Sequence, residues 1–235
     1  MDPRHLTIDD RLRGGCAYCG GPADTKDHVP SKVLLDDPLP QDMPVVDACS
    51  TCNQGFSLDE EYLACFLECV LCGTVEATGG HREKVKQSLL RKPKLVNQLR
   101  ASQRTDGSGG VIWLPDAGRV RNVVGKLARG HIAYELSVAE IEEPVELMFG
   151  PLACMCEADR IDFENAGAGE RREWPGVGSR AFRRACGVSP YSDEEGPWII
   201  VQTGRYRYAV DQHDGVTIRI VLAEYLACSV EWESV

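Results

Sequence analysis

Two stretches near the N-terminus decide the fold: CAYCGGPADTKDHVP (residues 16–30) and CSTCN (residues 49–53). They contain two CxxC pairs, Cys16 with Cys19 and Cys49 with Cys52. Four thiolates in two close pairs are the ligand set of a tetrahedral zinc ion. The sequence therefore predicts a zinc site formed by these four cysteines. Because four sulfurs leave no open coordination position, this zinc would hold the fold and would not react with a substrate.

The length and composition of the chain predict a folded protein of the cytoplasm. A chain of 235 residues has room for one large domain or two small ones. No apolar run is long enough to span a bilayer, and residues 1–13 lack the apolar stretch of a signal peptide. We therefore expect a cytoplasmic protein without a membrane partner. The eleven cysteines of such a chain indicate metal ligands and buried thiols, and not a disulfide framework.

The charge is unevenly distributed along the chain. A formal net charge of −10, taken alone, argues against a nucleic-acid partner. Residues 81–130, however, hold 12 Lys and Arg against 3 Asp and Glu, an excess of nine positive charges. Such a concentration is expected where phosphates bind, although a solvated helix face has the same composition. The candidate nucleic-acid contacts are Lys32, Lys84, Lys86, Arg91, Lys92, Lys94, Arg121, Lys126 and Arg129.

Local patterns predict short elements around the cysteines. Residues 25–30 are expected to form a strand ended by Pro30, and residues 36–47 a loop rich in Pro and Asp. A short helix is expected to open at Cys49. A second helix is expected to begin at Ser57, which stands at capping-box spacing from Glu60.

This second helix should end at Gly73. Its Cys65, Cys69 and Cys72 share one face, which fits thiols packed in a core better than metal ligands.

The middle of the chain is predicted to be mainly helical. Residues 81–104 have a helical pattern broken at Pro93, and residues 111–114 are expected to form a short strand. Residues 118–136 carry an apolar stripe at helical spacing, from which Lys126 and Arg129 are expected to lie apart.

The C-terminal part is predicted to form an antiparallel sheet. Three successive stretches have the composition of strands, and a fourth is expected to follow: residues 198–203, 205–210, 216–222 and 225–232. Residues 211–215 suit a hairpin loop, and residues 164–180 suggest a loop rich in Gly, Arg and Glu. Helices followed by an antiparallel sheet place the chain in the α+β class.

The arrangement of the cysteine motifs resembles the HNH (ββα-metal) endonucleases. The dipeptide Asp27-His28 lies between the two CxxC pairs, and Asn53 directly follows the last cysteine. The resemblance covers roughly residues 14–62. It implies a zinc-braced ββα-metal module in which Asp27 and Asn53 bind a catalytic Mg²⁺ or Mn²⁺ and His28 is the general base that activates water.

One position departs from the family pattern. Many members carry an Asn about five residues before the second CxxC, where it orients the catalytic histidine, whereas residues 42–48 contain none. Asp42, Asp47 or a backbone carbonyl would then orient His28.

The resemblance and the charge distribution together predict three parts. Residues 1–62 would form the HNH-like zinc module, residues 63–140 a helical, basic segment, and residues 141–235 an α+β region with antiparallel strands. The implied activity is that of a metal-dependent endonuclease acting on nucleic acid, with DNA favoured. A bacterial restriction or phage-defence role, with a partner protein or as a homodimer, is compatible with the acidic remainder of the chain.

The alternative is a non-catalytic zinc module that binds nucleic acid or protein. Asp27-His28 together with Asn53 favours the enzyme, because a binding module has no need of all three.

Overall fold

A computed structural model of the chain describes residues 12–41, 43–78, 80–105, 107, 109–165, 175–187, 197–212 and 215–233. The chain divides into two compact units, Phe56–Val123 and Met1–Gly55 with Val124–Val235. These bounds differ from the three expected parts. The bound between Val123 and Val124 falls inside the long helix α5 (Ala117–Leu136), where the local sequence carries no signal of a boundary. None of the helices in the described ranges is long and apolar enough to cross a membrane.

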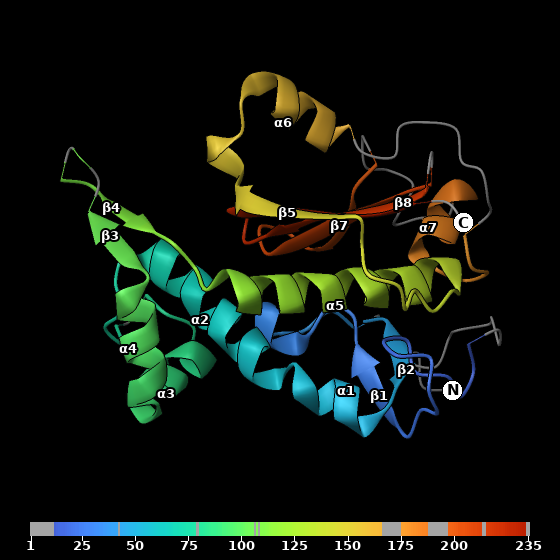
Figure 1. The fold of residues 1–235 in the computed structure, drawn as a ribbon, viewed down its shortest axis with the longest axis horizontal. Coiled ribbons are helices and arrows are strands. Elements are labelled where there is room, and N and C mark those ends of the chain that lie inside the picture. Colours follow the sequence, from blue (N-terminus) through green and yellow to red (C-terminus); the bar gives the residue numbers. More distant parts are fainter. Residues whose placement is uncertain are drawn as a thin grey trace. The chain divides into compact units, whose positions relative to one another are not determined.

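The unit that contains both chain ends begins with a short hairpin and a helix (Figure 1). The elements are β1 (Thr25–His28), the 3-10 helix η2 (Lys32–Leu34), β2 (Val45–Ala48) and α1 (Ser50–Gly55). β1 and β2 pair antiparallel, with Asp27 opposite Val46. The strand before Pro30 and the short helix after Cys49 are thus confirmed. The expected loop at residues 36–47 is wrong at its end, because Val45–Asp47 pair with β1.

The same unit contains a five-stranded antiparallel sheet in the order β5-β9-β8-β7-β6. The four predicted strands are confirmed as β6 (Ile199–Gln202), β7 (Tyr206–Asp211), β8 (Gly215–Leu222) and β9 (Leu226–Glu233). Sequence patterns missed β5 (Glu146–Pro151), which pairs with β9 at the sheet edge. No side chain of β5 is fully buried, so its sequence lacks the apolar alternation that identified the other strands.

Helices cover both faces of this sheet, as Figure 1 shows for α5 and α6 (Glu157–Glu164). Phe163 of α6 belongs to the buried cluster on one face, together with Leu152, Trp198, Ala209, Val221 and Ala227. On the other face, His131 of α5 contacts Tyr206 and Tyr208 of β7. Two short helices complete the unit: η3 (Leu152–Cys154) and α7 (Arg180–Ala185).

The second unit is mainly helical. Its elements, besides the start of α5, are α2 (Ser57–Cys72), α3 (Glu83–Arg91), α4 (Pro93–Ala101), β3 (Gln103–Thr105) and β4 (Val111–Trp113). Pro93 breaks the helical stretch as expected, and Gly73 ends α2 with a φ of 70°. The capping box is wrong: Phe56 is the N-cap, and its near-helical backbone places Ser57 already inside the helix.

The expected core thiols of α2 are confirmed for Cys65 and Cys69, which are buried. Burial raises the pKa of each to about 12, so both are neutral packing groups at physiological pH. Residues 103–105 form a strand paired with β4, although the helical pattern was expected to continue to residue 104. The expected loops at residues 164–180 and 211–215 each include positions outside the described residues.

Candidate metal centre and catalytic residues

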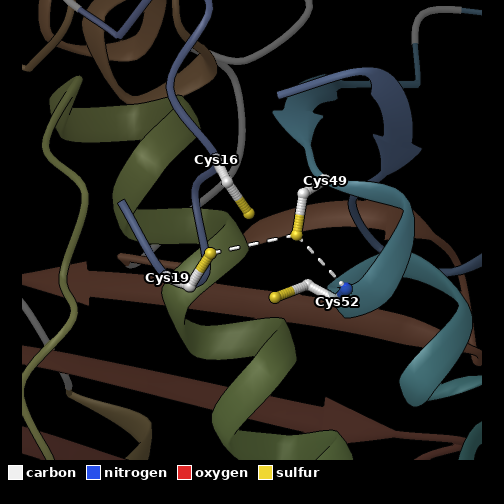
Figure 2. Close-up of side chains that lie close together, drawn as sticks. All are labelled: Cys16, Cys19, Cys49 and Cys52. Carbon is white, nitrogen blue, oxygen red and sulfur yellow. Dashed lines mark hydrogen bonds between the residues drawn. The ribbon is translucent and has the colours of Figure 1, made fainter. Parts of the chain in front are cut away.

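The four cysteines of the two CxxC pairs lie together, as Figure 2 shows. Their sulfur atoms all lie within 4.8 Å of one another, and Cys19 Sγ is 3.9 Å from Cys49 Sγ. Sulfurs at the corners of a tetrahedron with Zn–S bonds of about 2.3 Å are about 3.8 Å apart. The cluster of Cys16, Cys19, Cys49 and Cys52 therefore fits the predicted structural zinc ion.

Backbone groups of the two CxxC turns support the sulfurs. Gly20 has a φ of 71°, which lets the chain turn back directly after Cys19. The backbone N–H of Cys52, in the first turn of α1, donates to Cys49 Sγ at 3.4 Å. Burial alone would raise the pKa of the Cys16 thiol, but backbone hydrogen bonds, foremost from Cys49, lower it to about 7. Such a thiol is partly ionised at neutral pH, as metal binding requires.

Asp27, the expected ligand of the catalytic ion, is buried and has three partners. Its Oδ2 atom lies 2.7 Å from Lys126 Nζ and accepts a hydrogen bond of 2.7 Å from the Tyr18 hydroxyl. Its Oδ1 atom accepts a hydrogen bond of 2.9 Å from the backbone N–H of His28. A carboxylate has about four acceptor positions, so roughly one is left for a further ligand.

A divalent ion at Asp27 would have to share the carboxylate with the Lys126 ammonium. Two cations on one carboxylate repel each other, and a further anion beside them, such as a phosphate, would offset this repulsion. Asn53, the expected second ligand, donates from Nδ2 to the carbonyl oxygen of Lys26 at 3.2 Å and to Thr25 Oγ1 at 3.3 Å. The Asn53 side chain therefore lies against the strand that carries Asp27 and His28. Binding of Mg²⁺ or Mn²⁺ there stays a prediction.

His28 and Asp27 point to opposite faces of the hairpin, because successive side chains of a strand alternate. The Asp27 face is buried, whereas His28 is half-buried. Asp47, one expected partner of His28, instead accepts a hydrogen bond of 2.8 Å from the backbone N–H of Gly14 and pairs with Lys26. The other expected partner, Asp42, lies outside the described residues.

The expectation that Lys126 and Arg129 lie apart from the buried face of α5 is wrong. The Lys126 side chain is 2% exposed. That of Arg129 is 16% exposed, donates to the carbonyl oxygen of Glu142 at 2.9 Å and lies 3.4 Å from Glu143 Oε1. From Val124 to its end α5 contacts Asp27 of β1 and Tyr206 and Tyr208 of β7, and none of its residues there is exposed. Both side chains pair with acids of the protein, Lys126 with Asp27 and Arg129 with Glu143.

Ion pairs neutralise at least half of the basic side chains in residues 81–130. Six of them face acids outside the window: Arg82–Glu68, Lys92–Glu61, Arg100–Glu76, Arg119–Asp59, Lys126–Asp27 and Arg129–Glu143. The excess of nine charges in the sequence window is therefore reduced to three or fewer. Of the remaining candidate contacts, Lys32, Lys84, Arg91, Lys94 and Arg121 are exposed and Lys86 is half-buried.

Sequence patterns missed a buried polar network at the end of α5. Glu135 accepts hydrogen bonds from the Tyr208 hydroxyl and, at 2.7 Å, from the backbone N–H of Ala181. His131 Nε2 lies 2.8 Å from the Tyr206 hydroxyl. Burial raises the pKa of Glu135 and lowers that of His131 well below its ordinary value. The available signal was the i, i+4 spacing of His131 and Glu135 within an otherwise apolar helical stretch.

Comparisons with protein-family models, with curated proteins and with solved structures give no match. The site is therefore defined by its own residues and geometry.

Proposed function

We propose that this chain is a metal-dependent endonuclease of the HNH type that hydrolyses phosphodiester bonds, with DNA as the favoured substrate. The observation that carries the proposal is the order of elements around the cysteine cluster. The antiparallel strands β1 and β2 are followed by α1, as a ββα-metal module requires. Asp27 and His28 end β1, and the amide of Asn53 in α1 donates to the carbonyl oxygen of Lys26 on that strand.

Each of the three residues has the chemistry that its proposed role needs. His28 is the general base, since an imidazole accepts a proton from water near neutral pH. Asp27 and Asn53 supply oxygen ligands of the kind that Mg²⁺ and Mn²⁺ prefer. When bound, such an ion would neutralise charge on the scissile phosphate. The half-buried His28 side chain is accessible from the outer face of the hairpin.

One observation favours the alternative, a non-catalytic zinc module that binds nucleic acid or protein. The Lys126 ammonium already neutralises the Asp27 carboxylate. In such a module the pair would join α5 to the hairpin and do nothing further.

Plasmid cleavage distinguishes the two functions. Purified protein is incubated with supercoiled DNA, with and without added Mg²⁺ or Mn²⁺, beside His28→Ala and the matched control His213→Ala. The enzyme should cut only with the added ion, and His28→Ala should cut at least about a hundredfold more slowly. Zinc content and Tm should stay at the wild-type value, because His28 is not a zinc ligand. Equal cleavage by wild type and His28→Ala removes the catalytic role. Tight binding of DNA without any cleavage supports the non-catalytic zinc module.

The ion dependence tests the ligands separately. Asn53→Ala should raise the Mg²⁺ concentration needed for half-maximal cleavage. It should leave Tm close to the wild-type value. Undiminished cleavage in EDTA, with the zinc still bound, would exclude an ion at Asp27 and Asn53.

A further inference from the structure

A cavity of about 310 Å³ lies beside the hairpin. Its walls come from the hairpin, from the chain just before the first CxxC pair, from the end of α5 and from residues 177–179. All of these belong to the same compact unit. The volume lies at the small end of the ~300–1,000 Å³ range of small-molecule sites, which suits a ligand of one ring system with its substituents.

The lining has three kinds of groups. Apolar residues, among them Val45 and Val177, line the cavity together with Tyr134 and Ser137. Two cations, Arg13 and Lys26, also line the cavity and are both exposed to solvent. An apolar and aromatic surface with hydroxyl groups suits a nucleobase, and neighbouring cations suit a phosphate. One acid, Asp47, pairs with Lys26, so the cations of the lining exceed its acids by one charge.

The wall at residues 176–179 is held by buried groups. The backbone N–H of Gly176 donates to the carbonyl oxygen of Glu135, and that of Ala181 donates to the Glu135 carboxylate at 2.7 Å. A Cβ at Gly176 would lie 2.5 Å from Ser137 Oγ and 3.2 Å from the carbonyl oxygen of Glu135, so a larger residue would force this wall to shift. Ser137 itself has a φ of 57°, which is uncommon for a residue with a side chain. A buried carboxylate and a serine with positive φ both lower the stability of the fold. Packing alone does not require either of them at this wall.

Part of the cavity lining, Lys26, Val45 and Asp47, stands on the face of the hairpin that carries His28, whereas Val46 stands on the other face. Lys26 and His28 are two residues apart on β1, so their side chains share a face. A phosphate held by Lys26 would therefore lie on the face from which His28 is accessible.

We propose that this cavity takes up one nucleotide of the substrate strand, with the base inside and the phosphate at Arg13 and Lys26. The role of the nucleotide rests on the proposed endonuclease function, because the bound unit would fix the neighbouring phosphodiester beside His28. The cavity itself is defined independently of catalysis.

Titration of the full chain with 5′-deoxymononucleotides, followed in two-dimensional amide NMR spectra, tests the proposal. The protein carries His28→Ala throughout, so that binding is measured without cleavage. Val177→Trp fills the cavity, because Val177 lines it and is 50% exposed. Val145→Trp is the matched control on a residue that is 57% exposed and does not line the cavity. At least one nucleotide should bind saturably. Its affinity should be at least about tenfold lower in Val177→Trp and unchanged in Val145→Trp.

Competition identifies the source of the nucleotide. A short single-stranded oligonucleotide should displace the mononucleotide. Failure to compete would assign the cavity to a free nucleotide and overturn its role in substrate binding. The proposal also fails if none of the four mononucleotides binds saturably, or if Val177→Trp binds as tightly as the control. Plasmid cleavage without nucleotide binding removes this inference alone, whereas nucleotide and oligonucleotide binding without any cleavage removes the nuclease alone.

Discussion

The ammonium group of Lys126 lies 2.7 Å from Oδ2 of Asp27, and both side chains are buried. The Tyr18 hydroxyl donates to the same carboxylate oxygen, and Lys126 donates to Ser31 Oγ at 3.0 Å. A buried ion pair is tolerated when further hydrogen bonds satisfy its polar atoms, and this pair meets that condition. The pair joins α5 to the strand that ends with His28, so it fixes the position of the proposed general base.

Removing the ammonium should strongly destabilise the protein. Lys126→Met leaves the Asp27 carboxylate buried beside an apolar side chain, which should lower the free energy of unfolding by about 3–5 kcal/mol. Adding Asp27→Asn should restore part of this loss, since a neutral amide can still accept the Tyr18 hydroxyl. Urea denaturation with equal m-values measures both. Lys94→Met, on an exposed lysine, is the control and should change stability by less than about 0.5 kcal/mol. A similar small effect of Lys126→Met would mean that the pair is absent in solution.

The cysteine cluster should retain close to one zinc ion per chain after purification, because four preformed thiolate ligands bind zinc tightly. Cys49→Ser should lose the zinc and unfold or aggregate the hairpin unit. Cys186→Ser, on an exposed cysteine outside the cluster, should keep both zinc and fold. Elemental analysis with a thermal melt checks the three proteins. Folded wild-type protein without zinc would show that the cluster packs as unliganded thiols.

His131 should make the protein less stable in weak acid. Burial, and to a smaller extent Arg180, lower its pKa well below the ordinary value of about 6.5, whereas the unfolded chain keeps that value. Below about pH 6.5 the unfolded chain therefore binds a proton that the folded chain does not, and the free energy of unfolding falls as the pH decreases. His131→Leu should reduce this slope by up to about 1.4 kcal/mol per pH unit.

Urea denaturation between about pH 5 and 8 measures the slope for both proteins. The mutation also removes the bond to the Tyr206 hydroxyl, which shifts stability at every pH but leaves the slope unaffected. The raised pKa of Glu135 acts in the opposite direction, because stability from its protonated form is lost as the pH rises above about 4.5. That contribution is common to wild type and His131→Leu. Equal slopes would mean that His131 takes up its proton in the folded protein.

Residue patterns were informative where a local signal decides the structure. The CxxC pairs gave the cysteine cluster, Pro93 the start of α4, Gly73 the end of α2, and apolar alternation the strands β6–β9. Patterns failed where distant partners decide. β5 exists because β9 offers an unpaired edge, and Lys126 is buried because Asp27 lies opposite it. The excess positive charge of residues 81–130 was overestimated for the same reason, since the acids that neutralise it lie outside this window in the sequence.

In the described part of this window, cations that pair with an acid can be compared with cations that do not. Among the described residues, Lys86, Arg91 and Lys94 face no acid, whereas Lys92, Arg100 and Arg119 pair with Glu61, Glu76 and Asp59. Changing either trio to Gln removes three positive charges. If Lys86, Arg91 and Lys94 contact phosphates, their loss should weaken DNA binding at all sequences. The slope of log K against log salt should become shallower by up to about 0.9 per lost contact.

The ion-paired trio is the matched control for net charge and should change the slope much less. Filter binding at several salt concentrations, on two unrelated duplexes, measures both trios. Equal effects of the two trios would show that only net charge matters. Unchanged slopes in both would make the window a solvated helix face, and the affinity for DNA would have to come from Lys32 and the hairpin unit.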